Sequence, residues 1–158
     1  MTEERIGFTK VALPYGWMGN MSPYPINVGD TEWRTSEALF QAMRFDDEDV
    51  REAIRAEKSP MGAKFKMKAN RDKIIVEPHS KLDIMNMAMC LNHKVQQHPK
   101  LKQLLIETGD AHIYEDVTAR GDRGGNLFWG AMLVNGTLVG KNTLGKLWMS
   151  LRTQLMNS

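Results

Sequence analysis

The sequence predicts one mainly α-helical domain over residues 1–158, with a small β-hairpin element. Three observations carry this prediction. Several amphipathic stretches between residues 35 and 108 begin with capping residues and end near Pro or Gly. After Gly109 the apolar residues form short runs that are typical of strands, and one of them contains an Asn-Gly turn. An amphipathic stretch near the C-terminus then restores helical spacing.

The elements follow in this order. Residues 6–30 are expected to be rich in loops, because prolines and glycines interrupt them. The expected helices are residues 35–45, 46–60, a third from Ser59 and Pro60 onward, 80–99 and 99–108. Expected strands are residues 111–116 and 127–134, with a hairpin at 133–140 and a closing helix at 142–155 capped by Asn142. The methionines of the fourth helix, Met85 and Met89 among them, are expected to fill the core.

The composition points to a globular protein of the cytoplasm. Apolar residues make up 42% of the chain and charged residues 25%. No apolar run approaches the roughly 20 residues that span a bilayer, so no membrane contact is expected. The N-terminal residues 1–5 are polar and acidic, unlike a secretory signal. The single cysteine, Cys90, excludes an internal disulfide, which favours a reducing compartment.

Familiar cofactor motifs are absent from the sequence. It contains neither the G-x-x-x-x-G-K-[ST] phosphate loop nor a G-x-G-x-x-G turn. Cys90 and His93 are one helical turn apart, but no second pair has the spacing of metal ligands. We therefore expect no metal and no cofactor, and we expect Cys90, between Met89 and Leu91, to be an inert core residue.

Two residues and one cluster have both a structural and a functional interpretation. Glu37 stands in the first turn of a helix, where an acid stabilises the helix dipole, yet its apolar surroundings could turn it into a base. Trp129 before Gly130 could be a core residue or a platform on which a base stacks. The basic residues between Lys64 and Lys73 could form a solvated face or attract phosphates.

Several motifs together resemble one family. They are GNMSPYPI, TEWRTSEALFQAMRF, LIETGDAHIYE, NLFWG and NTLGKLWMSLR, which occur in the order and spacing of the NADAR family, from about Phe8 to Leu155. The resemblance implies a mainly α-helical fold and an N-glycosidase that hydrolyses a ribosyl C–N bond. It implies substrates such as phosphorylated riboflavin-pathway intermediates (phosphoribosylamines) or ADP-ribose attached to guanine in nucleic acid. The partner would therefore be a small ribosylated molecule, or a modified nucleic acid.

The resemblance also assigns roles to residues. Glu37 falls on the family's essential acid, and Trp129 and Asn126 are the other candidate catalytic residues. The candidate substrate-binding residues are Asn20, Gly130, Asn142 and Gly145, which fall on family motifs, and Arg44 and Lys64, whose positive charges could bind phosphates. In this hypothesis Glu37 stabilises the oxocarbenium-like sugar, and Trp129 and Asn20 hold the leaving base.

The chain departs from the family pattern at Gly19, Met21, His79 and Asn126. Relatives often have a tryptophan near the position of His79 and an aspartate at that of Asn126. Three classes of function therefore stay open from the sequence: the N-glycosidase, a non-catalytic ADP-ribose or nucleotide reader, and a structural or interaction protein. The sequence does not determine the oligomeric state.

Overall fold

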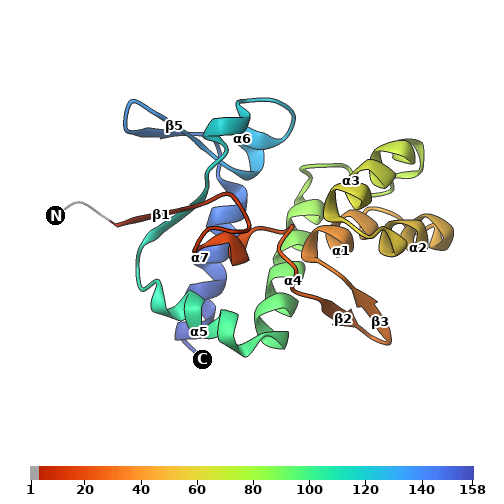
Figure 1. Cartoon of the computed structure of the whole chain (residues 1–158), viewed down its shortest axis with the longest axis horizontal. Coiled ribbons are helices and arrows are strands. Elements are labelled where there is room, and N and C mark those ends of the chain that lie inside the picture. Colours follow the sequence, from red (N-terminus) through yellow and green to blue (C-terminus); the bar gives the residue numbers. More distant parts are fainter. Residues whose placement is uncertain (1–3) are drawn as a thin grey trace. The chain divides into compact units, whose positions relative to one another are not determined.

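The computed structural model describes residues 4–158, which fall into two compact units (Figure 1). Residues 20–99 form one unit, and residues up to Gly19 together with residues 100–158 form the other. Seven α-helices and three two-stranded sheets lie within these described residues, so the predicted mainly α fold is confirmed. The extent of a single domain over 1–158 stays a prediction.

The unit of residues 20–99 consists of a β-hairpin and four helices. These are β2 (Ile26–Val28), β3 (Thr31–Trp33), α1 (Ser36–Ala42), α2 (Glu48–Ala56), α3 (Pro60–Ala69) and α4 (Lys81–Gln97). The sequence predicted all four helices, and their capping side chains are in place. The oxygens of Thr35, Asp47, Ser59 and Ser80 each accept a hydrogen bond from a backbone N–H in the first turn of the helix that follows.

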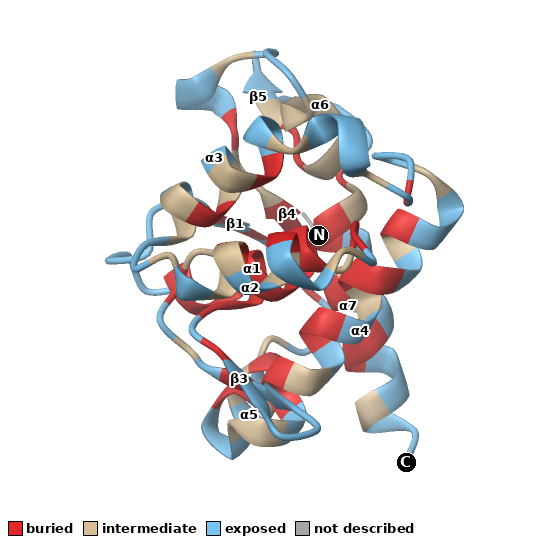
Figure 2. Cartoon of the chain, turned by 90° about the vertical axis from the view of Figure 1, so that its right-hand side faces the viewer, coloured by how far each residue is buried: buried red, intermediate tan, exposed pale blue. Residues whose placement is uncertain are grey.

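Helix α1 is the centre of this unit. All seven of its residues are buried, and it contacts α2, α3, α4 and β3. Figure 2 colours the chain by burial, with buried residues in red. It ends at Ala42, earlier than the predicted Phe45. At this end, Arg51 of α2 donates hydrogen bonds to the carbonyl oxygens of Ala42 and Phe45, at 3.4 and 3.2 Å. A side chain from the next helix therefore helps to satisfy carbonyl oxygens where the helix ends.

Helix α4 corrects one prediction about the core. Met87, Leu91 and Val95 are buried as a helical stripe. Met85 and Met89, predicted to fill the core, are about half exposed instead, at 55% and 49%. The apolar residues of α4 cover more than one face, so spacing alone did not decide which face is inside.

The other unit contains a parallel strand pair, a hairpin and three helices. They are β1 (Arg5–Phe8), α5 (Pro99–Glu107), β4 (His112–Glu115), α6 (Asn126–Trp129), β5 (Met132–Val134), β6 (Thr137–Val139) and α7 (Thr143–Met156). Strand β1 pairs with β4, and β5 pairs with β6 around the predicted Asn135-Gly136 turn. The predicted strand 127–134 is wrong in its first half, where residues 126–129 form a helical turn closed by a bond from the Gly130 N–H to the Asn126 carbonyl.

Helix α7 packs closely on β4, and this contact explains why residue 142 is an asparagine and residue 145 a glycine. Asn142 precedes the helix at φ 52°, but its side chain does not cap α7 as predicted. It donates to the carbonyl of Ile113 at 2.9 Å and accepts from the N–H of Glu115 at 3.2 Å. A Cβ at Gly145 would lie 2.2 Å from the Ile113 oxygen, so only glycine permits this approach.

Within residues 4–158, no helix is both long and apolar enough to cross a bilayer.

Candidate active site

Three consecutive residues at the start of α1 together position one carboxylate. Thr35 caps the helix by accepting from the N–H of Ala38 at 3.1 Å. The hydroxyl of Ser36 donates to the side-chain oxygen of Asn20 at 3.0 Å, and the backbone N–H of Glu37 donates to the carbonyl of Asn20 at 3.0 Å. The sequence Thr-Ser-Glu therefore fixes the helix start against residue 20, and Glu37 carries the charge.

Asn20 is held from both ends of its side chain. Its oxygen accepts from Ser36, and its amide nitrogen lies 3.2 Å from the sulfur of Met87 on α4. The segment before the β2–β3 hairpin is thereby attached to both α1 and α4. Asn20 thus accepts the hydrogen bonds that fix the start of α1, next to Glu37. Its contact with a substrate stays a prediction.

Burial determines the acidity of Glu37. The residue is only 8% exposed, and desolvation raises the pKa of its carboxyl group above the ordinary value of 4.5. Three neighbours oppose this shift by favouring the ionised form: the hydrogen bond from Gln41, and the positive charges of Lys64 and Arg44. A carboxylate in this setting can act as a base or stabilise a cation nearby.

A chain of hydrogen bonds leads from Glu37 to a buried ion pair. Nε2 of Gln41 donates to Oε1 of Glu37 at 2.9 Å, and Nη1 of Arg44 donates to Oε1 of Gln41 at 3.2 Å. Arg44 also binds Asp83 of α4 through two parallel bonds, from Nε at 2.9 Å and from Nη2 at 2.8 Å. Asp83 is fully buried, and it accepts a further bond from the backbone N–H of His79 at 2.9 Å.

The two oxygens of Glu37 differ in their surroundings. Oε1 accepts the bond from Gln41, whereas Oε2 has no hydrogen-bond partner among the described residues. Every buried polar side-chain atom of the described chain does have a partner. Oε2 is therefore accessible to solvent, although the residue as a whole is buried. One oxygen is held by the protein, and the other has no protein partner and keeps some exposed surface.

The predicted basic residues of this unit have different surroundings. Lys64 on α3 is half-buried, and its charge acts on Glu37. The guanidinium of Arg44 is already engaged by Asp83 and Gln41, which gives it a task the sequence did not indicate. Contact of either residue with a substrate phosphate stays a prediction.

The remaining predicted residues belong to the unit formed by residues up to Gly19 and 100–158. Trp129 is partly exposed at the end of α6, and its ring meets that of Phe128 edge-on at 4.9 Å. The amide of Asn126 donates to the carbonyl of Gly121 at 2.9 Å. Gly130 lies against β4 and its neighbours, since a Cβ there would be 2.6 Å from the Glu115 carbonyl. Asn142 and Gly145 likewise contact the backbone of β4. All of these residues have structural roles, and their roles in chemistry stay predictions.

Cys90 is the inert residue that the sequence predicted. It is fully buried on α4, and burial raises the pKa of its thiol far above the ordinary value of 9.0. Among residues 4–158, no group of three His, Cys, Asp or Glu side chains is placed to hold a metal ion.

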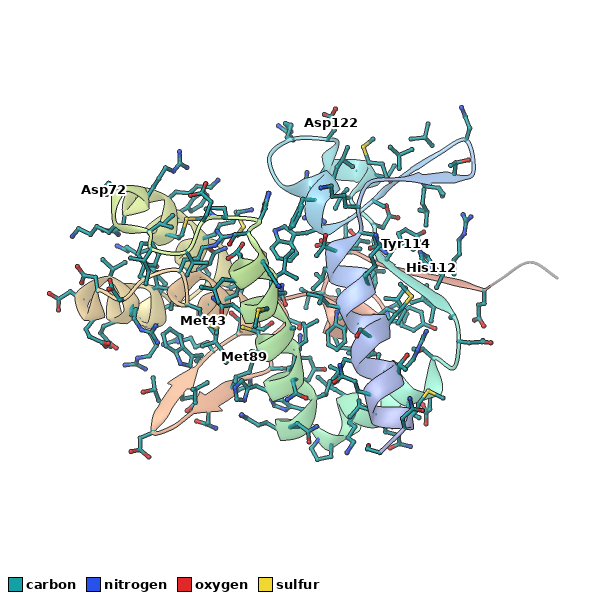
Figure 3. The ribbon with its side chains drawn as sticks, turned by 180° about the vertical axis from the view of Figure 1, so that it is seen from behind. Met43, Asp72, Met89, His112, Tyr114 and Asp122 are labelled. Carbon is teal, nitrogen blue, oxygen red and sulfur yellow. The ribbon has the colours of Figure 1, made fainter. Side chains whose placement is uncertain are left out.

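Two hollows of the structure are lined by residues other than the predicted ones. A cavity of about 280 Å³ lies between β1, residues 14–17 and α5. A second, of about 200 Å³, lies beside α1 and is lined by Val28, Leu39, Met43, Arg51, Met89 and His93. Figure 3 shows two of these residues, Met43 and Met89, on the side seen from behind. We place the candidate site at Glu37 because its chemistry, and not the size of a hollow, distinguishes it.

Sequence reasoning missed two buried charged residues of α4, of which Asp83 belongs to this site. Asp83 was not among the predicted site residues, yet it is the buried counter-charge of Arg44. Lys94 of α4 was not singled out, although it is fully buried and donates to the hydroxyl of Ser22 at 2.8 Å. Burial lowers the pKa of Lys94 to about 7. Both Asp83 and Lys94 could have been found in the sequence, because each is a charged residue on an otherwise apolar stripe of α4.

Comparisons with known proteins place the whole chain in one family. The model of the NADAR domain matches residues 7–156. N-glycosidase YbiA of Escherichia coli (strain K12) is 36% identical over 155 residues, which cover 98% of this chain and 91% of YbiA. N-glycosidase Npun_R5314 of Nostoc punctiforme is 31% identical over 160 residues, covering 96% of this chain and 93% of that protein.

Two further matches concern a longer relative and a solved structure. Riboflavin biosynthesis protein VVA0006 of Vibrio vulnificus is 29% identical over 156 residues, covering 97% of this chain and 39% of that protein. The NMR structure of E. coli YbiA has a TM-score of 0.80 and 35% identity, covering 99% of this chain and 88% of that one. The chain therefore belongs to the NADAR family, and its class of enzyme is that of the N-glycosidases.

Proposed function

We propose that this protein hydrolyses the C–N bond between a ribose and an amine or base, with Glu37 as the carboxylate at the reacting carbon. The substrate would be an ADP-ribose-type compound, ADP-ribosylated guanine in nucleic acid, or a phosphoribosylamine of the riboflavin pathway. The observation that carries the proposal is the arrangement of Glu37, which is buried and fixed through Oε1 while Oε2 is open.

The reaction needs a negative charge at the sugar. As the C–N bond breaks, its electron pair leaves with the nitrogen, which takes up a proton, and positive charge develops on the ribose. An ionised carboxylate nearby lowers the energy of this state most where water is largely excluded. Water then bonds to the anomeric carbon and gives its proton to the carboxylate or to solvent. The open Oε2 of Glu37 suits both tasks.

The surroundings of Glu37 also suit a phosphorylated substrate. Lys64, half-buried on α3, acts on the carboxylate and would offer an ammonium group to a phosphate. The Vibrio relative, 39% of which the match covers, is named a riboflavin biosynthesis protein. That name supports a riboflavin-pathway intermediate as the substrate. The family resemblance supports ADP-ribose substrates equally. In both cases the scissile bond joins a ribose to nitrogen.

A panel assay tests the proposal. The protein would be incubated with phosphoribosylamine intermediates of the riboflavin pathway, NAD-derived compounds and DNA carrying ADP-ribosylated guanine. Release of ribose phosphate or ADP-ribose is expected for at least one class, and the Glu37→Gln variant is expected to release none above background. Calorimetry with ADP-ribose runs in parallel. Binding of ADP-ribose without turnover of any substrate would contradict the proposal. It would establish instead that the protein is a non-catalytic ADP-ribose-binding module.

Salt dependence separates two of these substrate classes. A protein that neutralises several phosphates of DNA loses affinity steeply as salt rises. The formal net charge of this chain is only +2. Turnover that is nearly independent of salt would point to the small metabolite, and a steep loss between 50 and 200 mM salt would point to the nucleic acid.

A further inference from the structure

The hydrogen-bond chain behind Glu37 has a fixed direction. Arginine has only donors, so the atom of Gln41 that faces Arg44 must be its amide oxygen. The amide nitrogen of Gln41 then has to face Glu37, to which it donates at 2.9 Å. Arg44 in turn cannot rotate freely, because two of its nitrogens bind the two oxygens of the buried Asp83. The ion pair of Arg44 and Asp83 therefore sets the orientation of the Gln41 amide, three residues before Arg44.

We propose that Gln41, oriented by Arg44 and Asp83, is a positioning residue that keeps Oε1 of Glu37 unprotonated and leaves Oε2 as the oxygen that faces the substrate. An amide N–H donates most strongly to an ionised carboxylate oxygen, and a proton on Oε1 would weaken that oxygen as an acceptor. The bond from Gln41 therefore favours Oε2 as the oxygen that takes up a proton. This inference rests on the proposed role of Glu37 in catalysis.

The same bond also increases the fraction of Glu37 that is ionised. Burial raises its pKa, and the bond from Gln41 is the largest of the effects that lower it. Lys64 of α3 and Arg44, just after α1, add their charges in the same direction, and Cys90 of α4 is near enough for the charge of Glu37 to raise the pKa of its thiol. Charged residues of the other neighbours, such as Arg51 of α2 and Glu32 of β3, are not among the causes of the shift.

Two variants of Gln41 test the inference without changing the size of the side chain greatly. Gln41→Met removes the donor, so the pKa of Glu37 is expected to rise by about one unit or more. The acidic limb of the pH profile of kcat/KM should move up by the same amount. Gln41→Glu keeps an acceptor for Arg44 but presents a second carboxylate to Glu37. It is expected to move the limb at least as far.

A matched control lies in the other unit. On α5, Nε2 of Gln103 donates to Oε1 of Glu107 at 3.1 Å, a Gln–Glu pair four residues apart that is exposed to solvent. Gln103→Met removes the same kind of bond, and the pH profile is expected to stay in place. Circular dichroism of all three variants verifies that they fold.

NMR titration of the glutamate carboxyl carbons distinguishes the possible failures, because it measures the pKa of Glu37 without a substrate. If the pKa of Glu37 and the acidic limb are the same in Gln41→Met as in the wild type, the positioning role is wrong. If the pKa rises but Glu37→Gln retains full turnover, the orientation by Gln41 holds and the proposed function of Glu37 fails. A rise in pKa together with a shifted limb supports both.

Discussion

Glu37→Gln is expected to lower kcat/KM by roughly 10³-fold or more while leaving the protein folded. The amide has nearly the shape of the carboxylate, but it carries no negative charge and takes no proton from water. Loss of one group that stabilises the transition state by charge typically costs 10²–10³ in rate, and loss of a general base 10²–10⁴. The measurement is kcat/KM on the substrate that the panel assay identifies.

The stability of the same variant is expected to rise. The pKa of Glu37 is raised in the folded protein, so the folded state holds the proton more tightly than the unfolded state. Stability is therefore lost as pH rises from 4.5 through the folded-state pKa, and glutamine avoids that loss. At pH 8 the free energy of unfolding should be higher by about 0.5–2 kcal/mol, and at pH 4 the difference should vanish. A variant that is inactive because it is unfolded would contradict this account.

Asp83→Asn is expected to have the largest effect on stability. It keeps the size of the side chain but leaves the buried guanidinium of Arg44 without its counter-charge, since Arg44 and Asp83 are 5% and 0% exposed. Breaking a buried ion pair from one side typically costs about 3–5 kcal/mol. For a chain of this size that corresponds to a fall in melting temperature of roughly 6–20 °C. Differential scanning calorimetry at pH 7 measures it.

The control for Asp83 is an ion pair of similar length on the surface. Arg55 and Glu52 of α2 are 2.6 Å apart, with side chains 36% and 59% exposed. Water already solvates both charges, so Glu52→Gln should leave the melting temperature nearly unchanged. Equal effects of the two variants would mean that burial of the Arg44–Asp83 pair is not what makes it important.

The sequence predicted the helices of residues 20–99 well, because each begins with a side chain that caps it. Thr35, Asp47, Ser59 and Ser80 are local signals, and local hydrogen bonds decide where a helix starts. The ends were harder to predict. Helix α1 stops at Ala42, whose carbonyl accepts a hydrogen bond from Arg51, nine residues further on, and no local pattern contains that contact.

The carboxylate of the candidate site was identified from its motif, whereas its support was not. Glu37 and Gln41 lie one turn apart, so their proximity followed from helical spacing. Asp83 lies 39 residues after Arg44, and only the packing of α4 on α1 brings the two together. Asn142 was expected to cap α7, but its side chain bonds to the backbone of β4, 29 residues earlier in the chain. That contact, too, depends on packing and not on local sequence.

A crystal structure of Glu37→Gln with an uncleaved ribosylated substrate tests the central claim most directly. The account predicts that the side chain of residue 37 keeps its bond to Gln41 through one atom. Its other terminal atom should lie within about 3.5 Å of the anomeric carbon of the ribose. A ribose bound elsewhere, or a side chain at position 37 that turns its open end away from the sugar, would contradict it.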